Sequence, residues 1–525
     1  MTLSSALATS TIDRNNGSCF PGFLKSCLAI LLMLAASFVI AQDLTGPGTV
    51  GKWQILTNKV PINPVHAAVM HNGKVLMIEG KNTVPPLAAI WDPATQVATT
   101  FAITYTMFCD AMVVLPDGRP FVMGGTLQFT PAFTGQPLTA AYDLTTGVFT
   151  NQASMADGRW YPTGTVLDDG RVMVFSGQDD GNGDTNKAVE FFTANSGIGS
   201  WSQEFIANWT PPLYPRMHLL PDGDVFYSGS GTLSKFFNPA TQVWSDGPTT
   251  ILPTARVYGS SVLLPLSPAN GYDPKVMILG GGKFDTTTAA TDTTEIVDLS
   301  FIISIPPRWT QGPAMTQPRI QLNATILPSG NVLVTGGSKF NEDPTTASLN
   351  ADLYHSNPTD PKFNTFTSAG MNAIPRLYHS NAILLPDATV LLTGSNPPKV
   401  PFENRLELYQ PAYLFKLDGT LAVRPVITSV PAGPIAYNTA FQVNTPDAGM
   451  ITSVVLIRPA GVTHAFNMEQ RLVELTFTTD AGGLKVTSPR DGKIAPPGYY
   501  MVFILNSSGV PSVSKFIQLC NGPCL

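Results

Sequence analysis

Five polar or redox-active residues stand at the same place in a segment that recurs along the chain. Each lies nine residues before the turn of its own copy, which is a glycine in four copies and Ala388 in the last: Cys109, Tyr161, Tyr214, Gln321 and His379. Thiols, phenols and imidazoles bind metals and exchange electrons when they converge. Imidazole nitrogen and phenolate oxygen suit Cu(II) in a flat site, whereas zinc prefers a tetrahedral set. Tyr378, directly before His379, offers a further phenol.

Each of these residues also has a simpler explanation. A loop tyrosine is common, and a single histidine is more often a hydrogen-bonded surface residue than a ligand. The residues are nevertheless 52 to 270 positions apart and share one place in the repeat. This coincidence favours a common site. A Cu(II) site of this kind needs one more nitrogen ligand.

The repeat itself predicts the elements that position these side chains. An apolar run, a turn, a second apolar run and a closing glycine recur seven times, and the closing residues are Gly80, Gly125, Gly177, Gly229, Gly281, Gly337 and Gly394. Their spacing of 45 to 57 residues matches the four-stranded blades of a β-propeller. We therefore predict an all-β fold with a seven-bladed kelch-type β-propeller over residues 42–400.

Three further segments support this fold. The sequences "WDPATQV", "YDLTTGV" and "FNPATQVW" predict the turn between the two outer strands of a blade, and "GKWQIL" at 51–56 is expected to complete the last blade. The repeat ends after Gly394. We expect a connector at 401–423 and an immunoglobulin-like β-sandwich at 424–525, where strand-like runs alternate with turn residues.

The amino-terminal residues predict secretion. An uncharged run from Ser26 to Ala41 follows Arg14 and Lys25, which is typical of a signal peptide over 1–41 with cleavage near Ala41. An uncleaved membrane anchor is the alternative, although the run is short for a span. After cleavage, Cys520 and Cys524 flank an "NGP" turn and are expected to form a disulfide in an oxidising compartment. Cys109 then remains without a cysteine partner.

Composition excludes one class of partner. The formal net charge is −6 and no lysine or arginine cluster is present, whereas nucleic-acid binding needs a basic face. We therefore expect no nucleic-acid partner.

Five motifs resemble the galactose oxidase and glyoxal oxidase family of copper radical oxidases. They are "TMFCDA", "GRWYPTG", "RLYHSNAILLPD", "LIRPAGVTHAFNMEQR" and "PPGYYMVFILNSSGVPSVSKFIQL", and they extend over nearly all of the mature chain. The resemblance implies that the carboxyl-terminal sandwich is the early-set domain of this family. It also implies one copper ion and a protein-derived radical cofactor.

By this resemblance, each reactive residue acquires a role. Cys109 is expected to form a thioether with the ring of Tyr161, which is then a copper ligand and the site of the radical. Tyr378 matches the axial tyrosine, which accepts the proton of the substrate. His379 matches the first histidine ligand, and His464 in "THAFN" matches the second, delivered by a carboxyl-terminal loop that reaches into the propeller.

The substrate expected from this comparison is a small aldehyde, reacting as its hydrate, or a primary alcohol, with O2 as the oxidant and H2O2 as a product. Asp179 stands where galactose oxidase has a tryptophan over the thioether. Trp160, directly before Tyr161, is instead similar to the pattern of the glyoxal oxidase branch of the family. Tyr214, Arg216 and Trp160 are expected to line the substrate pocket. The alternative is a catalytically inactive extracellular propeller that binds a surface or a carbohydrate. We expect a monomer, and an association with a cell wall or surface is compatible with secretion.

Overall fold

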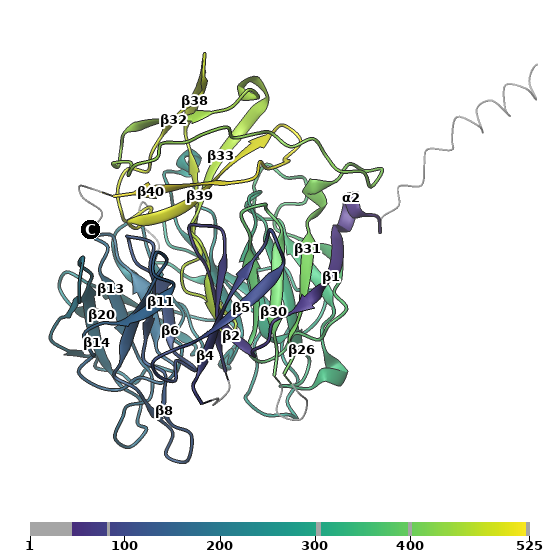
Figure 1. Cartoon of the computed structure of the whole chain (residues 1–525). Helices are drawn as coiled ribbons and strands as arrows, with labels where there is room; N and C mark the ends of the chain where they lie inside the picture. Colours follow the sequence, from purple (N-terminus) through teal and green to yellow (C-terminus); the bar gives the residue numbers. More distant parts are fainter. Residues whose placement is uncertain (1–44, 81–83, 301–305, 397–401, 521–525) are drawn as a thin grey trace, which may run out of the picture. The chain divides into compact units, whose positions relative to one another are not determined.

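The computed structural model describes residues 45–80, 84–300, 306–396 and 402–520. β-Strands dominate these ranges (Figure 1), and the helices are all short: α2 (Pro47–Val50), η1 (Pro268–Asn270), η2 (Pro344–Thr346), η3 (Ala412–Leu414) and η4 (Ala448–Met450). None of the helices in the described ranges has the length and apolar character needed to cross a membrane. The predicted signal peptide lies outside the described residues.

Within these ranges, seven sheets each contain four neighbouring antiparallel strands. We number these sheets in chain order. Sheet 1 contains β2 (Pro64–Val69), β3 (Val75–Glu79), β4 (Leu87–Asp92) and β5 (Val97–Ala102), and sheet 2 contains β6 (Ala111–Val114), β7 (Pro120–Met123), β10 (Thr139–Asp143) and β11 (Val148–Asn151). Sheet 3 contains β12 (Thr163–Val166), β13 (Val172–Phe175), β14 (Ala188–Thr193) and β15 (Ser200–Trp201), and β16 (Phe205–Ile206) also pairs with β14. Sheet 4 contains β17 (Met217–Leu219), β18 (Val225–Tyr227), β19 (Leu233–Asn238) and β20 (Val243–Thr249).

Sheet 5 contains β21 (Ser260–Leu263), β22 (Lys275–Leu279), β23 (Thr294–Asp298) and β24 (Trp309–Gln311), and sheet 6 contains β25 (Ile320–Ile326), β26 (Val332–Ser338), β27 (Asn350–Tyr354) and β28 (Phe366–Met371). Sheet 7 contains β29 (Ser380–Leu384), β30 (Val390–Gly394), β31 (Arg405–Gln410) and β1 (Lys52–Lys59).

The predicted repeat corresponds to the first two strands of each sheet. These strands are apolar and buried along nearly their whole length, as in β6 and β7, because both of their faces are covered. The fourth strands are largely exposed, as in β5. The three predicted outer turns join β4 to β5, β10 to β11 and β19 to β20, so these predictions are confirmed.

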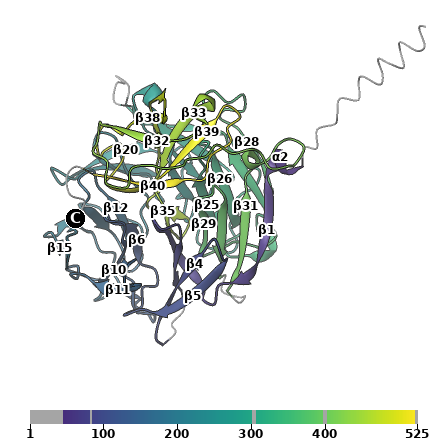
Figure 2. The same cartoon turned by 45° about the horizontal axis from the view of Figure 1, so that its top comes forward.

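The first strand of the described chain completes the last sheet. β1 pairs with β31 in antiparallel register, with Trp53 opposite Tyr409, and the two strands lie side by side in Figures 1 and 2. This confirms the predicted role of residues 51–56. The pairing leaves β31 with a neighbour on both edges, which removes an open edge from sheet 7.

The first strands of the sheets contact one another in sequence. β2 contacts β6 and β29, β6 contacts β12, β12 contacts β17, and β25 contacts β21 and β29. His218 in β17 and Ser261 in β21 join sheets 4 and 5 through a hydrogen bond of 2.7 Å between Nε2 and Oγ. The starts of these strands are therefore brought near one another.

Buried arginine–carboxylate pairs fix the segments that enter four of the sheets. An arginine just before the first strand reaches an acidic residue on the third strand of the same sheet, and the pairs are Arg159–Glu190, Arg256–Glu295, Arg319–Asp352 and Arg376–Glu407 at 2.8 to 3.2 Å. The same guanidinium groups donate to backbone carbonyls, such as that of Ser176 for Arg159. These bonds compensate the burial of both charges and hold the strand entry in one conformation.

The carboxyl-terminal residues form two packed sheets. One contains β36 (Leu472–Leu475), β33 (Ile451–Ile457), β39 (Gly498–Asn506) and β40 (Lys515–Leu519), and the other contains β32 (Ala440–Asn444), β38 (Gly483–Thr487) and β37 (Phe477–Asp480). Val454 and Val443 of the two sheets share one hydrophobic core, and residues of sheets 4 and 5, such as Phe226 and Val276, belong to the same core.

A hairpin from this part of the chain enters among the first strands of the sheets. It consists of β34 (Gly461–Thr463) and β35 (Phe466–Asn467), and β34 pairs with β2 so that Val462 faces Ala67. β34 also contacts β6 and β29, and β35 contacts β25. The predicted delivery of the "THAFN" loop into the middle of the sheets is therefore confirmed.

Candidate metal centre

Six residues at equivalent places carry side chains toward the middle of the sheets. Each stands at the start of a first strand and has left-handed backbone, with φ between 45° and 68°: Cys109, Tyr161, Tyr214, Tyr258, Gln321 and His379. This conformation costs a residue with a side chain roughly 1–2 kcal/mol and needs support from its surroundings. The amide of Tyr161 donates to the carbonyl of Cys109 at 2.9 Å, and that of Tyr214 donates to Tyr161 at 2.8 Å. The five residues aligned in the sequence analysis thus share one structural position.

Tyr258 was missed by the alignment. Its repeat has a longer turn that contains η1, so counting back from the turn glycine fails there. Its backbone carbonyl accepts the amide of Gln321 at 2.7 Å, which is the same link between neighbouring sheets. Alignment on the first residue of each strand would have found it.

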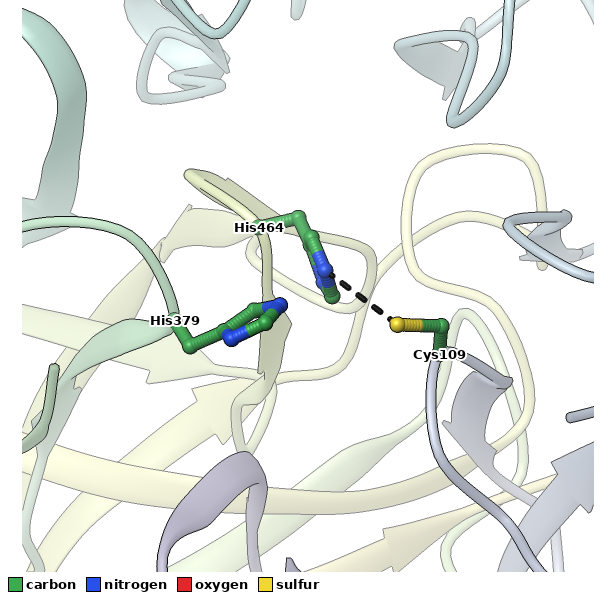
Figure 3. Close-up of side chains that lie close together, drawn as sticks. All are labelled: Cys109, His379 and His464. Carbon is green, nitrogen blue, oxygen red and sulfur yellow. Dashed lines mark hydrogen bonds between the residues drawn. The ribbon is translucent and has the colours of Figure 1, made fainter. Parts of the chain in front are cut away.

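Three buried side chains form a compact set of ligand atoms. Cys109, His379 and His464 each offer one atom, and these atoms lie within 4.8 Å of one another. The three side chains come from sheet 2, sheet 7 and the carboxyl-terminal hairpin and point toward one another (Figure 3). Sγ of Cys109 lies 3.5 Å from Nε2 of His464.

Hydrogen bonds fix the tautomer of both histidines. Nδ1 of His379 is bonded to Oδ1 of Asn396, which can only accept, so Nε2 of His379 carries a lone pair. Nδ1 of His464 lies 2.6 Å from Oγ1 of Thr463, whose own proton goes to the carbonyl of Val65. Nε2 of His464 therefore also carries a lone pair.

The environment keeps both rings neutral. Burial lowers the pKa of His379 to about 3, and burial with the neighbouring His379 lowers the pKa of His464 well below its usual value. Nε2 of His379 is buried and has no hydrogen-bond partner among the residues that the structure describes. A buried nitrogen with a free lone pair, aimed at a second such nitrogen, has the arrangement of a metal ligand.

Two phenols complete the cluster. The hydroxyl oxygens of Tyr161 and Tyr378 are 2.6 Å apart, and that of Tyr258 lies 3.4 Å from Tyr378. The Tyr378 ring stacks on His379 with centroids 3.8 Å apart, and the Tyr161 ring meets His464 edge-on at 4.8 Å. Burial raises the pKa of both Tyr161 and Tyr378 well above the usual value. The structure thus brings together two phenol oxygens and two imidazole nitrogens.

Cys109 lies in one buried cluster with Trp160 and Tyr161. Burial raises the pKa of the Cys109 thiol, and the neighbouring side chains of Tyr161 and Trp160 act in the opposite direction. Among the described cysteines, Cys109 is the one in free form. Cys520 takes part in a disulfide bond, and its predicted partner Cys524 lies outside the described residues, so that pairing stays a prediction.

The three predicted pocket residues have different surroundings. Trp160 meets the Tyr161 ring edge-on at 4.8 Å. Tyr214 is buried beneath the cluster, where its ring lies 4.6 Å from that of His464 and its hydroxyl donates to the Asp110 carbonyl. Arg216 is also buried, and both of its terminal nitrogens donate to the Arg256 carbonyl at 3.2 Å. Their contact with substrate stays a prediction.

An aromatic cover beside the cluster was not predicted. The hairpin of β8 (Thr126–Gln128) and β9 (Thr134–Gly135) carries Phe129 and Phe133, which are 39% and 38% exposed. Both rings pack on Trp160, at 5.8 and 5.2 Å. The same stretch, "TLQFTPAFTG", has no counterpart in the other repeats, so the repeat alignment gave no signal for it.

Comparison with known proteins assigns the family. A model of the glyoxal oxidase N-terminus matches residues 86–413, and one of the galactose oxidase-like early set domain matches residues 424–519. The chain belongs to the glyoxal oxidase and galactose oxidase family of copper-dependent oxidases. The early-set prediction for the carboxyl-terminal sheets is thereby confirmed.

Individual members of the family are similar over most of the chain. An aldehyde oxidase of Vitis pseudoreticulata is 29% identical and covers 93% of this chain and 100% of its own length. A galactose oxidase of Gibberella zeae is 27% identical, over 94% of this chain and 73% of its own length. A solved fungal alcohol oxidase in complex with copper shares the fold, with a TM-score of 0.76, 24% identity and coverage of 90% and 100% of the two chains.

Proposed function

We propose that this protein is a secreted copper radical oxidase. It oxidises a small aldehyde, in its hydrated form, or a primary alcohol with O2, and it releases H2O2. The observation that carries this proposal is the pair of phenol oxygens 2.6 Å apart, beside two neutral imidazoles and one thiol. The relatives named as aldehyde oxidase and galactose oxidase support the two substrate classes.

The donor set fits copper. Tyr161, Tyr378, His379 and His464 would hold the ion, since two phenolate oxygens and two imidazole nitrogens suit Cu(II). Within the described part of the chain, the buried Nε2 of His379 has no hydrogen-bond partner, and this is expected of an atom that binds a metal ion. A bound copper ion supplies one-electron redox chemistry at this place.

Cys109 and Tyr161 form the second half of the cofactor. A thioether between Sγ and a ring carbon makes the phenol easier to oxidise, so Tyr161 can hold a radical. Both residues are buried, at 0% and 8% exposure, which protects a radical from side reactions with solvent. The edge-on ring of Trp160 covers the same place.

The residues divide the reaction between them. Tyr378 accepts the hydroxyl proton of the substrate, and Tyr161 accepts a hydrogen atom from the carbon that bears this hydroxyl. The substrate loses two electrons and two protons in all, and the second electron is the one that a bound copper ion would take up. An alcohol then becomes an aldehyde, and an aldehyde hydrate becomes an acid. O2 takes up the two electrons and two protons as H2O2.

The proposed domain organisation follows from the arrangement of the sheets. Sheets 1 to 7 form a seven-bladed kelch-type propeller. The propeller extends beyond the predicted boundary at residue 400, because β31 (Arg405–Gln410) lies within the predicted connector 401–423 and belongs to sheet 7. The residues after β31 connect it to the sandwich at 424–525, and the mature chain is a secreted monomer. The contacts from β2 to β29 and back, together with the His218–Ser261 bond that joins β17 to β21, support a closed ring. A form that keeps residues 1–41 as a membrane anchor is the alternative for localisation.

Activity and mass test the proposal together. The mature protein is loaded with copper, and H2O2 is measured with a peroxidase-coupled dye over a panel of aldehydes and primary alcohols. We expect turnover in the wild type and none above background in Tyr161→Phe. The intact wild-type chain is expected to be two hydrogen atoms lighter than its sequence requires, beyond any loss from disulfides, whereas Cys109→Ala lacks this deficit. Tyr354→Phe, a buried tyrosine of sheet 6, is the matched control. Full turnover by Tyr161→Phe would refute the radical role.

An inactive surface-binding or carbohydrate-binding propeller is not favoured. Such a module has no need for a thiol, two phenols and two imidazoles at one buried point. If the copper-bound protein turned over none of the substrates, the binding module would become the favoured function.

A further inference from the structure

A buried histidine–aspartate pair lies directly behind Cys109. His66 in β2 and Asp110 are both 0% exposed, and Nδ1 of His66 lies 3.3 Å from Oδ1 of Asp110. Neither carboxylate oxygen of Asp110 has a hydrogen bond within the described residues. Burial of a carboxyl group with so little compensation costs stability, so the fold keeps this pair at an energetic disadvantage.

His66 holds the backbone of Cys109. The amide of Cys109 donates to Nε2 of His66 at 2.9 Å, which places the proton of the imidazole on Nδ1, the atom that faces Asp110. The carbonyl of Cys109 accepts the amide of Tyr161. Both backbone groups of Cys109 are thus fixed while the residue has a φ of +62°.

The link to His66 differs from the links at equivalent places. The amides of Tyr161, Tyr214 and Gln321 donate to the backbone carbonyl of the equivalent residue in the preceding sheet. For Cys109, a side chain replaces this backbone acceptor. The thiol that must meet the Tyr161 ring therefore depends on an imidazole for its position.

We propose that His66, oriented by Asp110, is a positioning residue for the formation of the thioether between Cys109 and Tyr161. The inference rests on the proposed function. In the step concerned, the S–H bond of Cys109 and one ring C–H bond of Tyr161 break and a C–S bond forms. The two protons and two electrons released reduce O2 to H2O2.

Position dominates the rate of a reaction between two groups of one folded chain. A misplacement of about 1 Å lowers such rates by on the order of 100-fold. Loss of the bond between His66 and the Cys109 amide frees the left-handed backbone to relax, which moves Sγ relative to the ring. Asp110 acts one step further away, because its Oδ1 lies 3.3 Å from Nδ1 of His66 and this contact favours the ring orientation in which Nε2 faces the Cys109 amide.

A matched pair of variants tests this role. His66→Gln keeps an acceptor oxygen near the place of Nε2, whereas the amide of His66→Asn ends near Nδ1 and falls short of Cys109. Each full-length mature chain is prepared reduced and free of copper, and copper and air then start the reaction. The fraction of chains lighter by two hydrogen atoms is followed by intact mass, and the C–S bond is located by peptide mapping.

We expect His66→Asn to form the thioether at least about tenfold more slowly than the wild type. His66→Gln should restore most of the rate, and Asp110→Asn, which keeps the volume, should be intermediate. His355→Leu is the control, because it removes another buried histidine paired with an aspartate, Asp360. It should cross-link at the wild-type rate.

The outcomes separate the two proposals. A wild type without the mass deficit contradicts the cross-link of the proposed function itself. A normal wild type together with folded His66→Asn and Asp110→Asn chains that react at the same rate overturns the role of His66. Should His66→Asn not fold, the rate of Asp110→Asn decides, since an Asp110→Asn chain that cross-links at the wild-type rate also overturns the proposal.

Discussion

Each histidine of the metal cluster uses one ring nitrogen to direct the other. His379 is held by Asn396, and His464 by the hydroxyl of its own neighbour Thr463. The second bond matters because Thr463 donates its proton elsewhere and so must accept from the imidazole. A short polar side chain, adjacent in sequence, thereby determines which atom of His464 faces the centre.

Thr463→Val tests this point, since it removes the acceptor and keeps the shape. We expect copper affinity to fall by about 10- to 100-fold, which is usual for loss of a hydrogen bond that orients a histidine ligand. Competition with a chelator of known affinity measures the change. Thr335→Val is the control, because Oγ1 of Thr335 is buried and makes no hydrogen bond within the described ranges. Equal copper affinities in the two variants would contradict the orienting role.

At the scale of elements, two hairpins complete what the seven sheets begin. The hairpin of β34 and β35 brings His464 from the carboxyl-terminal part, and it is anchored by pairing with β2. The hairpin of β8 and β9 brings exposed phenylalanines over Trp160. The hairpin of β34 and β35 therefore supplies a histidine of the metal cluster, and the hairpin of β8 and β9 makes the surroundings of the cluster apolar.

Phe133→Ser tests the influence of the second hairpin. Phe133 is partly exposed next to Trp160, so removal of its ring takes apolar surface away from a bound substrate. We expect kcat/KM for a primary alcohol with a long alkyl chain to fall about tenfold relative to that for a small polar aldehyde. Phe363→Ser, at an exposed phenylalanine in the turn between β27 and β28, should leave this ratio unchanged. An unchanged ratio in Phe133→Ser would exclude contact with the substrate.

The sequence predicted the elements that repeat and missed those that do not. Two apolar runs around a turn form a local signal, so the first two strands of each sheet were accessible, as were the outer turns and the closing strand β1. Cys109, Tyr161 and His379 were found because they share one distance to a turn. Tyr258 escaped because its turn is longer.

The missed interactions are long-range. His66 and Asp110 come from different sheets, and neither residue has a local pattern that indicates its partner. The same holds for the arginine–carboxylate pairs, such as Arg159–Glu190, in which an ordinary arginine becomes buried only through its sheet. A single sequence shows residue types and distances along the chain, but tertiary packing determines which charges meet.

At the scale of the whole molecule, the carboxyl-terminal sheets and the seven sheets share their interior. Val454 and Val502 belong to one core with Phe226 of sheet 4 and Val276 of sheet 5. His218 lies where these parts meet, since it bonds Ser261 of sheet 5 and its ring lies 5.6 Å from that of Phe466 in the hairpin. A change at His218 therefore acts on several parts together.

Acid is expected to weaken the molecule through His218. Burial, with smaller contributions from Arg471 and Arg216, lowers the pKa of His218 from 6.5 to about 3. Between these values the unfolded chain binds one more proton at this residue, so the free energy of unfolding falls as the pH falls. The contribution is about 1.4 kcal/mol per pH unit.

His218→Gln isolates this contribution, because glutamine bonds Ser261 without titrating. We expect urea unfolding of the copper-free wild type to lose about 1.4 kcal/mol more per pH unit than the variant between pH 6 and 4. Ser261→Ala retains the histidine and should retain the wild-type slope. Parallel pH dependences of wild type and His218→Gln would contradict the assignment.

The pairing of β1 with β31 ties the order of synthesis to the completion of the fold. Lys52 is opposite Gln410, so residues that leave the ribosome early must wait for a partner that is made more than 350 residues later. Sheet 7 is therefore incomplete while translation is in progress, and Lys52–Lys59 lack their strand partner throughout that time. Transport of an unfolded chain across a membrane is compatible with this order of folding, because β1 and β31 pair only after both strands have emerged.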